Sequence, residues 1–294
     1  MDPVTNTTKV PSFAQIAWRE IVNSKMALIS FILVTTTVLT VFIWAGFFMP
    51  DGATNMDLFN SNNAPSDRHI LGTDDAGRDM VQMLVLGARN SLAITFAMTA
   101  ITFIFGSLLG VFAGFYGGKI DNIIMRIVDI MSMLPGLMVI IVILTAITDR
   151  NIWHFIMVTS IFGWIGVTRV VRTRALQQGR MEYVHASKTL GTPNLTIIFR
   201  EVMPNLISIL SGNFILNLAA NMGVETGLTI IGFGLPFHVP SLGRLITVAL
   251  NPAFMLNRPW QWAPALIFVV FMTLGIVFIG QAVSRAADAK QRTV

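Results

Sequence analysis

Long apolar runs alternate with shorter polar segments along the chain, and this pattern predicts helices that cross a membrane. The uncharged runs cover residues 26–50, 90–118, 130–148, 151–168, 202–224 and 259–284. A helix rises about 1.5 Å per residue, so roughly 20 apolar residues span a hydrocarbon core about 30 Å thick. We therefore expect an all-α polytopic membrane protein with six transmembrane helices.

The runs and the segments between them divide the chain into consecutive parts. The run from Met26 is too long for a signal-peptide core, so we expect it to stay as the first transmembrane helix. Apolar positions from Phe13 onward have roughly helical spacing, which predicts an interfacial helix before it. The predicted parts are a cytoplasmic or interfacial segment (1–25), the first transmembrane helix (26–49), an extracytoplasmic loop (50–89), a core with the other five helices (90–284) and a cytoplasmic tail (285–294).

Composition argues against most other classes of protein. Hydrophobic residues make up 54% of the 294 residues and charged residues only 12%, whereas soluble domains carry about 25% charged residues. With no cysteine, the chain has no disulfide framework and no thiolate metal site. The net charge of +5 is explained by topology and anionic lipid, so a nucleic-acid partner is not expected.

The distribution of charge predicts the orientation. Lys and Arg near the ends of transmembrane helices are retained preferentially in the cytoplasm. Most Lys and Arg residues fall in segments that share a side with both termini, while the loop at 50–89 on the other side is rich in aspartate. We therefore expect both termini in the cytoplasm (N-in/C-in).

Two features inside the predicted helices concern helix packing or the shape of a pore. The second helix has a glycine at every fourth position, namely Gly106, Gly110, Gly114 and Gly118. Glycines at this spacing share one face and allow another helix to approach, so a packing role is favoured. The third helix contains Pro135, which is expected to kink it.

Two carboxylates lie inside or beside apolar runs, where ionisable groups are costly unless they face a partner or water. Glu225 in the fifth helix is the better functional candidate, for a pore or for helix packing. Asp129 lies one helical turn from Arg126 near the predicted cytoplasmic end, so a local ion pair explains it.

The outer segments contain two distinctive runs. The loop at 50–89 is long for a segment without a purpose, and it reads His-Ile-Leu-Gly-Thr-Asp-Asp-Ala-Gly-Arg-Asp at 69–79. A docking surface and a solvated cap over the helix ends both explain it. Residues 232–244 are rich in Gly and Pro, which predicts a re-entrant or outer-mouth element shielded by protein.

The cytoplasmic loop at 169–204, between the fourth and fifth helices, reads Glu-Tyr-Val-His-Ala-Ser-Lys-Thr-Leu-Gly at 182–191. Tyr183, Ala186 and Leu190 share a helical face. Gly191, followed by Thr and Pro193, is a stop signal, so we expect an amphipathic helix of about three turns. Such a helix is suited to insert into a groove on another protein.

This loop resembles the Glu-Ala-Ala loop of ABC importer permeases, in which the motif forms the coupling helix. On this chain the motif falls on His185, Ala186, Ser187, Gly191 and Pro204. His replaces the leading Glu and Ser the second Ala, while the lead-in Glu-Tyr-Val at 182–184 matches the peptide branch. The runs at 69–79 and 232–244 also resemble the C-type subunit of the oligopeptide and dipeptide branch.

The resemblance implies a type I ABC importer fold in a bacterial cytoplasmic membrane, with a coupling helix between helices four and five. It implies a heterodimer with a homologous permease, two ABC ATPase subunits and an extracytoplasmic peptide-binding protein. This chain has no intact phosphate-binding loop, so we expect it to be non-catalytic and to bind no cofactor, with ATP and Mg on the partner ATPases.

The resemblance also assigns roles to residues. The expected ATPase-coupling residues are Glu182, Tyr183, His185, Ala186, Ser187, Leu190, Gly191 and Pro204. The expected receptor-facing or loop-ordering residues are Gly72, Thr73, Asp74, Gly77, Arg78 and Asp79. The candidates for a pore or for helix packing are Gly106, Gly110, Gly114 and Glu225.

Other functions remain open at this point. A nickel, dipeptide or glutathione importer of the same family shares every one of these motifs. An ion-coupled secondary transporter would use Glu225 directly and need no ATPase, and the amphipathic cytoplasmic loop argues against it. An intramembrane enzyme is remote, because the four histidines are scattered and form no His-Glu-x-x-His run.

Overall fold

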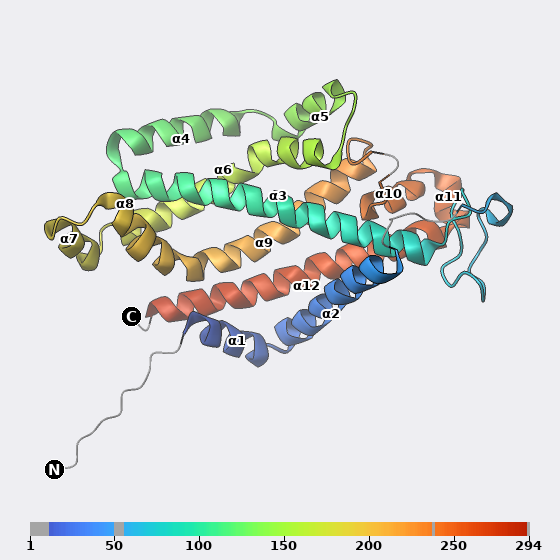
Figure 1. Ribbon diagram of the computed structural model, residues 1–294, viewed down its shortest axis with the longest axis horizontal. Helices are drawn as coiled ribbons and strands as arrows, with labels where there is room; N and C mark the ends of the chain where they lie inside the picture. Colours follow the sequence, from blue (N-terminus) through green and yellow to red (C-terminus); the bar gives the residue numbers. More distant parts are fainter. Residues whose placement is uncertain (1–11, 50–55, 237–238, 293–294) are drawn as a thin grey trace, which may run out of the picture.

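The computed structural model describes residues 12–49, 56–236 and 239–292, which are largely helical (Figure 1). Five long helices lie along one another and are long and apolar enough to cross a membrane. They are α2 (Lys25–Phe48), α3 (Met80–Tyr116), α6 (Ile152–Gln178), α9 (Met203–Ile230) and α12 (Pro259–Arg292). The predicted all-helical membrane architecture is confirmed.

Short helices occupy the segments before and between the long ones. They are α1 (Phe13–Asn23), η1 (Leu58–Asn60), α7 (Glu182–Thr189), α8 (Asn194–Ile197), the π-helix η2 (Ile198–Val202), α10 (Leu242–Ile246), η3 (Thr247–Leu250) and α11 (Pro252–Asn257). The expected helix near the N-terminus is α1, which starts with a capping box between Ser12 and Gln15. Residues 1–11 of the predicted N-terminal segment lie outside the described residues, as do 50–55, 237–238 and 293–294.

The third predicted transmembrane helix is a bent pair rather than one kinked helix. α4 (Gly118–Met133) and α5 (Gly136–Ala146) meet at an angle of 78°. Leu134 and Pro135 form the break. The ring of Pro135 disfavours helical backbone at the preceding residue, and Leu134 is accordingly extended. Pro135 then occupies the N-cap position of α5. The pair carries the chain from the end of α3 to the start of α6 (Figure 1), so the bundle has up to six crossings if the pair counts as one span.

Several helices extend beyond their uncharged runs. α3 begins at Met80, inside the predicted loop at 50–89, and α6 continues to Gln178, inside the predicted loop at 169–204. α12 continues to Arg292, through most of the predicted tail at 285–294. A charge ends an apolar run without ending a helix, because a helical turn at or beyond the membrane surface tolerates charged side chains.

The closest helix packing in the core joins α3 to α6 through glycines. A Cβ added at Gly106 would lie 2.8 Å from the main-chain oxygen of Trp164, and one at Gly110 2.7 Å from Cβ of Val171. One at Gly114 would lie within 2.5 Å of the next turn of α6. Gly118 is not part of this face, because α3 ends at Tyr116 and Gly118 opens α4 with φ of +53° and open space around it. The predicted four-glycine face therefore has three members.

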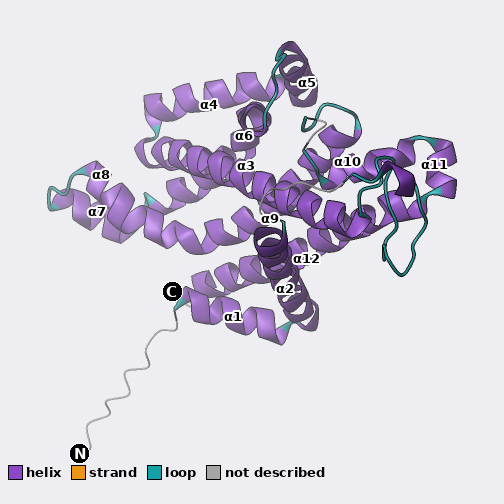
Figure 2. Ribbon diagram, turned by 45° about the vertical axis from the view of Figure 1, so that its right-hand side comes forward, coloured by secondary structure: helices purple, strands orange, loops and turns teal. Residues whose placement is uncertain are grey.

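The two ends of the bundle differ in what they carry. α7 and the C-terminal end of α12 lie at one end, and α1 packs against α12 near that end through Ile21, Ala282 and Val283 (Figures 1 and 2). The loop at 56–79, α10 and α11 lie at the other end (Figure 1). Both described ends of the chain therefore share a side with α7, and the assignment of that side to the cytoplasm stays a prediction.

Candidate functional site

α7 is fixed to the bundle by one apolar anchor. Val184 is fully buried in a cluster that also contains Val171 and Ala175 of α6, Ile197 of α8 and Ile198 of η2. The cluster joins the end of α6, α7 and the start of the helix that leads into α9. α7 is therefore packed against two long helices, although it projects at the end of the bundle (Figure 1).

Polar contacts reinforce this anchor on both sides of α7. The Ser187 hydroxyl donates to the Glu201 carboxylate, 2.8 Å from Oε1. The Tyr183 hydroxyl donates to Gln178 Oε1 over 2.8 Å and accepts from Asn205 Nδ2 over 3.3 Å. These bonds tie α7 to α6, η2 and α9.

The outward side of α7 is exposed. Glu182, His185 and Ala186 are exposed, and Leu190 just past the helix is 85% exposed. An exposed leucine beside a short helix is suited to insert into a hydrophobic groove on a partner. α7 runs from Glu182 to Thr189 and has eight residues. It is therefore shorter than the predicted three turns.

The predicted helix stop at Gly191 is confirmed. Gly191 has φ of +80°, and its N–H donates to the Lys188 oxygen over 3.0 Å. The Thr192 N–H donates to the Ser187 oxygen over 3.0 Å. This pair of bonds is a Schellman cap, which requires the left-handed backbone that glycine adopts most readily.

Pro204 lies at the start of α9 and coincides with a change of helix type. Residues 198–202 form the π-helix η2 directly before it. Proline has no N–H to donate within a helix, and a π-turn is one local adjustment that keeps the helix continuous around such a gap. Glu201 and Asn205, on either side of Pro204, hold α7, whereas Pro204 itself is exposed at the start of α9.

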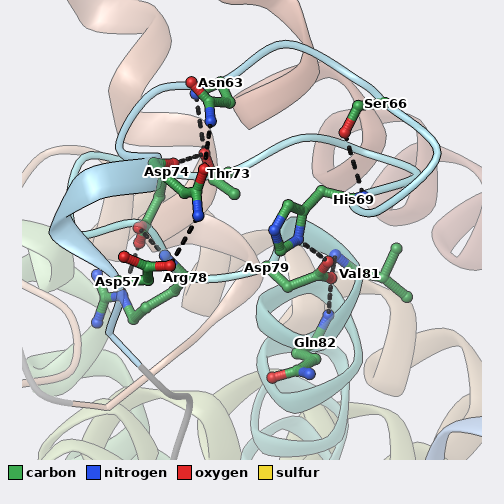
Figure 3. Close-up of polar contacts among 11 residues, drawn as sticks. Asp57, Asn63, Ser66, His69, Thr73, Asp74, Arg78, Asp79, Val81 and Gln82 are labelled. Carbon is green, nitrogen blue, oxygen red and sulfur yellow. Dashed lines mark hydrogen bonds and ion pairs between the residues drawn. The ribbon is translucent and has the colours of Figure 1, made fainter.

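At the opposite end of the bundle, the run at 69–79 is ordered by its own carboxylates (Figure 3). Asp74 Oδ1 accepts from the main-chain N–H groups of Ala76, over 2.9 Å, and Arg78, over 2.8 Å. Asp74 Oδ2 accepts from Arg78 Nε over 2.7 Å. One carboxylate therefore closes the turn and pairs with the guanidinium that follows it.

Asp79 connects the loop to α3 (Figure 3). Its Oδ1 accepts from the N–H groups of Val81, over 2.8 Å, and Gln82, over 3.2 Å, as the N-cap of α3. Its Oδ2 lies 2.8 Å from Nδ1 of His69. The first residue and the last residue of the run are thus in contact at the entrance of α3.

The other motif residues face inward. Thr73 is fully buried; its main-chain oxygen accepts from Gln261 Nε2 of α12 over 2.9 Å. Gly72 and Gly77 have φ of +72° and +74°. A Cβ at Gly77 would lie 1.7 Å from the Asp57 oxygen, and one at Gly72 2.9 Å from Cδ1 of Trp260. These positions therefore require glycine both for the backbone and for space.

A cavity of about 330 Å³ opens beside this run. It lies between the loop, the start of α3, and the segment from α10 to α12, and three arginines line it: Arg78, Arg244 and Arg258. Burial lowers the pKa of the Arg244 guanidinium from its ordinary value, and the nearby Asp75 carboxylate opposes that shift. This end of the bundle is therefore a charged and structured surface.

Glu225 lies at the junction of three elements. It is fully buried, and it accepts from Thr226 Oγ1 over 3.2 Å and from Thr229 Oγ1 over 3.4 Å. Ser91 of α3 also hydrogen-bonds to it, and the Ser91 hydroxyl oxygen accepts from the Leu242 N–H of α10 over 3.1 Å. Glu225 is therefore bonded within α9 and to α3, and α10 reaches the same place through Ser91.

The predicted ion pair of Asp129 with Arg126 is wrong. Asp129 Oδ1 lies 3.1 Å from Nη2 of Arg169 on α6, and Asp121 pairs with Arg172 one turn further along α6. α4 lies alongside α6 in this structure, so its carboxylates reach arginines across the helix pair. A sequence shows neighbours one turn apart but does not show which helix packs alongside.

The predicted sites therefore form three separate groups. The coupling residues gather around α7, the loop residues gather at the other end, and the glycines and Glu225 lie between them in the bundle. Sequence reasoning missed Val184 as the anchor of α7, and Glu201 and Asn205 as its polar supports. Val184 could have been found as an apolar residue within the predicted coupling helix. Glu201 and Asn205 could have been found as polar residues on either side of Pro204.

This arrangement defines a helical membrane protein with a short helix projecting from one end and an ordered cap at the other. Residues 106–293 match the family described as the binding-protein-dependent transport system inner membrane component. The chain belongs to this family.

The relatives and a solved structure agree with that assignment. The chain is 43% identical over 275 residues to the oligopeptide transport system permease protein OppC of Lactococcus lactis subsp. lactis (strain IL1403), which covers 93% of this chain and 94% of the relative. It is 31% identical over 282 residues to the dipeptide transport system permease protein DppC of Bacillus subtilis (strain 168), which covers 96% of this chain and 87% of the relative.

A chain of the inward-facing MetNI methionine ABC transporter shares the fold. The TM-score is 0.57 at 19% identity, over 71% of this chain and 97% of that chain. At this identity the likeness concerns the fold alone, and it confirms the predicted type I importer fold.

Proposed function

We propose that this chain is the permease subunit of an ATP-driven oligopeptide importer in a bacterial cytoplasmic membrane. The observation that carries the proposal is the 43% identity to an oligopeptide permease over nearly the full length of both chains. The five long apolar helices and the bent pair supply a multi-pass membrane body. In this function the chain forms a translocation pore together with a homologous permease and performs no catalysis itself.

Two ATPase subunits supply the energy in this proposal, and ATP and Mg bind to them. α7 is the contact that they move. Its exposed outer side, with Leu190 at its end, enters a groove on an ATPase subunit. Its inner side is held by Val184, Ser187 and Tyr183, so ATPase closure tilts α6 and α9 together and switches the side to which the pore opens.

The opposite end receives peptide from an extracytoplasmic peptide-binding protein. The contacts of Asp74, Asp79 and the two loop glycines support a loop-ordering role for the run at 69–79. The cap is then a fixed surface on which the receptor docks. Receptor contact through the exposed part of the loop stays a prediction.

A dipeptide importer is the second candidate, because the chain is also 31% identical to a dipeptide permease over nearly its full length. Nickel and glutathione importers of the same family remain alternatives on sequence motifs alone. A secondary transporter is less favoured, because Glu225 is fully buried and accepts hydrogen bonds from Thr226 and Thr229 of its own helix.

ATP-dependent uptake of labelled peptides tests the proposal. The chain is reconstituted in vesicles with its paired permease, ATPases and binding protein, and the control assembly lacks this chain. The proposal predicts uptake of peptides of several residues only when the chain and ATP are both present. Uptake restricted to dipeptides would select the second candidate, and ATP-independent uptake by the chain alone would contradict the proposal.

A further inference from the structure

Two carboxamides lie close to the middle of α9 on one face. Asn213 and Asn217 are both half-buried. Asn213 Nδ2 donates to the Ile209 oxygen over 3.1 Å, and Asn217 Nδ2 donates to the Asn213 main-chain oxygen over 2.8 Å. Among the described residues nothing donates a hydrogen bond to Oδ1 of either side chain. Each amide therefore keeps an open acceptor.

The next asparagine along this face behaves differently. Asn221 Nδ2 donates to Thr99 Oγ1 of α3 over 2.9 Å. That contact is the usual role of an amide within a membrane bundle, where it bonds across to a neighbouring helix. Within the described part of the chain Asn213 and Asn217 make no such bond, so adhesion between helices of this chain does not explain them.

A cavity of about 220 Å³ lies beside the two amides, between α3, α6 and α9. Its other walls are Phe103, Gly166, Val167, Val170, Val171 and Leu210. The cavity reaches the surface of the chain where Gly166 and Val170 are exposed. The cavity is therefore lined mostly by apolar side chains, with the two carboxamides along one edge.

The spacing of those acceptors matches an extended peptide. Residues four apart on a helix are separated by about 6 Å along its axis. In an extended chain, N–H groups that point to the same side recur every two residues, or about 6.6 Å. Main-chain hydrogen bonds of this kind give affinity without selecting side chains, and a neutral amide demands no charge on the ligand.

We infer that this cavity is a contact site on the path of the transported peptide, where Asn213 and Asn217 accept hydrogen bonds from main-chain N–H groups. The inference rests on the proposed function as a peptide permease. The cavity is smaller than the roughly 300–1,000 Å³ pockets that enclose drug-sized ligands. It therefore takes about one side chain of a peptide at a time against its apolar walls, while the main chain runs along the two amides.

The first test closes the cavity. A Cβ added at Gly166 meets nothing within 4 Å, so Gly166→Leu is accommodated by the helix and places its side chain at the mouth of the cavity. Gly46→Leu on α2 is the matched control, because a Cβ there also meets nothing within 4 Å. We expect Gly166→Leu to lower ATP-dependent peptide uptake at least tenfold while ATPase activity persists, and Gly46→Leu to leave both unchanged.

The second test removes the acceptors without filling the space. Uptake of an alanine peptide is compared with uptake of the same peptide carrying N-methyl groups on its main chain. We expect the wild-type assembly to take up the unmodified peptide severalfold faster. The double variant Asn213→Leu/Asn217→Leu should reduce that preference, and Asn213→Gln/Asn217→Gln, which retains the carboxamides, should keep it.

The outcomes separate this inference from the proposed function. Normal uptake by Gly166→Leu, or an unchanged preference in the double leucine variant, would overturn the peptide-contact site while the importer proposal stands. Absence of ATP-dependent uptake in the wild-type assembly, with this chain inserted and its partners present, would overturn the importer proposal and this inference together.

Discussion

The two ends of the bundle are built in opposite ways. α7 is a short helix held by one buried valine and a few side-chain bonds, and its outer side is exposed. The run at 69–79 turns its polar groups inward, where carboxylates cap main-chain N–H groups and glycines fit against neighbouring backbone. The first arrangement leaves its residues exposed, and the second uses its residues to hold the chain in one shape. The resemblance to importer permeases marked both the run at 182–191 and the run at 69–79, but it did not show that one is exposed and the other is packed inward.

The strongest test of this contrast is Gly77→Val. Gly77 has φ of +74°, and a Cβ there would lie 1.7 Å from the Asp57 oxygen. The left-handed backbone alone costs a non-glycine residue roughly 1–2 kcal/mol, and a backbone atom blocks the side chain as well. We expect a loss of more than about 3 kcal/mol in the free energy of unfolding, measured by thermal unfolding of the purified chain in detergent. Wild-type stability would show that the loop is not the rigid cap described above.

Removal of the loop carboxylate is expected to have the next largest effect. Asp74→Asn weakens the bonds to two main-chain N–H groups and to the Arg78 guanidinium, and bonds of this charge-assisted kind contribute roughly 1.5–3 kcal/mol each. We expect a loss of about 2 kcal/mol by the same measurement. Asp75→Asn is the control, because Asp75 is 83% exposed and 4.0 Å from Arg78, and exposed pairs of that kind contribute little. Equal losses in the two variants would contradict the inward role of Asp74.

Substitution at the helix stop of α7 is expected to lower the free energy of unfolding less than the two loop substitutions do, and to lower coupled transport more. Gly191 has φ of +80°, but a Cβ there meets nothing within 4 Å. Gly191→Val should therefore cost only the left-handed backbone, about 1–2 kcal/mol. Because it disturbs the helix stop, we expect at least a tenfold fall in peptide transported per ATP hydrolysed, with membrane insertion intact. Normal coupled transport in an inserted Gly191→Val assembly would count against α7 as the coupling helix.

The smallest effect is expected at the hydroxyl of α7. Ser187→Ala removes the bond to the Glu201 carboxylate, which is worth about 1.5 kcal/mol, the lower end of the range for a charged acceptor, because both side chains are only half-buried. We expect a loss of about that size and a twofold to threefold fall in coupled transport, measured in the same reconstituted assembly. Thr189→Ala is the control, because the Thr189 hydroxyl donates only to the main-chain oxygen of His185 in its own helix. Indistinguishable behaviour of the two variants would remove Ser187 from the support of α7.

Apolar runs predicted most of the membrane helices but not their ends. The runs stop at charges, whereas α3, α6 and α12 continue through charged turns beyond the apolar part. The third predicted helix is the one that the runs described incorrectly. Pro135 predicts that this helix is interrupted, but it does not predict the angle between the two halves. The 78° bend between α4 and α5 depends on how each half packs, and one sequence does not contain that information.

The motifs located α7 and the loop at 69–79 but did not predict the contacts within and around them. The helix stop at Gly191 followed from a rule of local backbone geometry, which is why it was predictable. The partners of Asp129 and Ser187 lie on other helices, so they depend on the packing of the whole bundle. Asn213 and Asn217 were visible in the sequence as polar residues four apart, but their importance depends on the cavity beside them.

Cross-linking from Leu190 tests the central claim most directly. The chain contains no cysteine, so Leu190→Cys introduces a single thiol at a position that is 85% exposed. Ile70→Cys, 75% exposed in the loop at the other end, is the matched control. In the assembled complex the account predicts a thiol-specific cross-link from position 190 to an ATPase subunit, and none to that subunit from position 70. A cross-link to the ATPase from position 70 and not from position 190 would contradict the account.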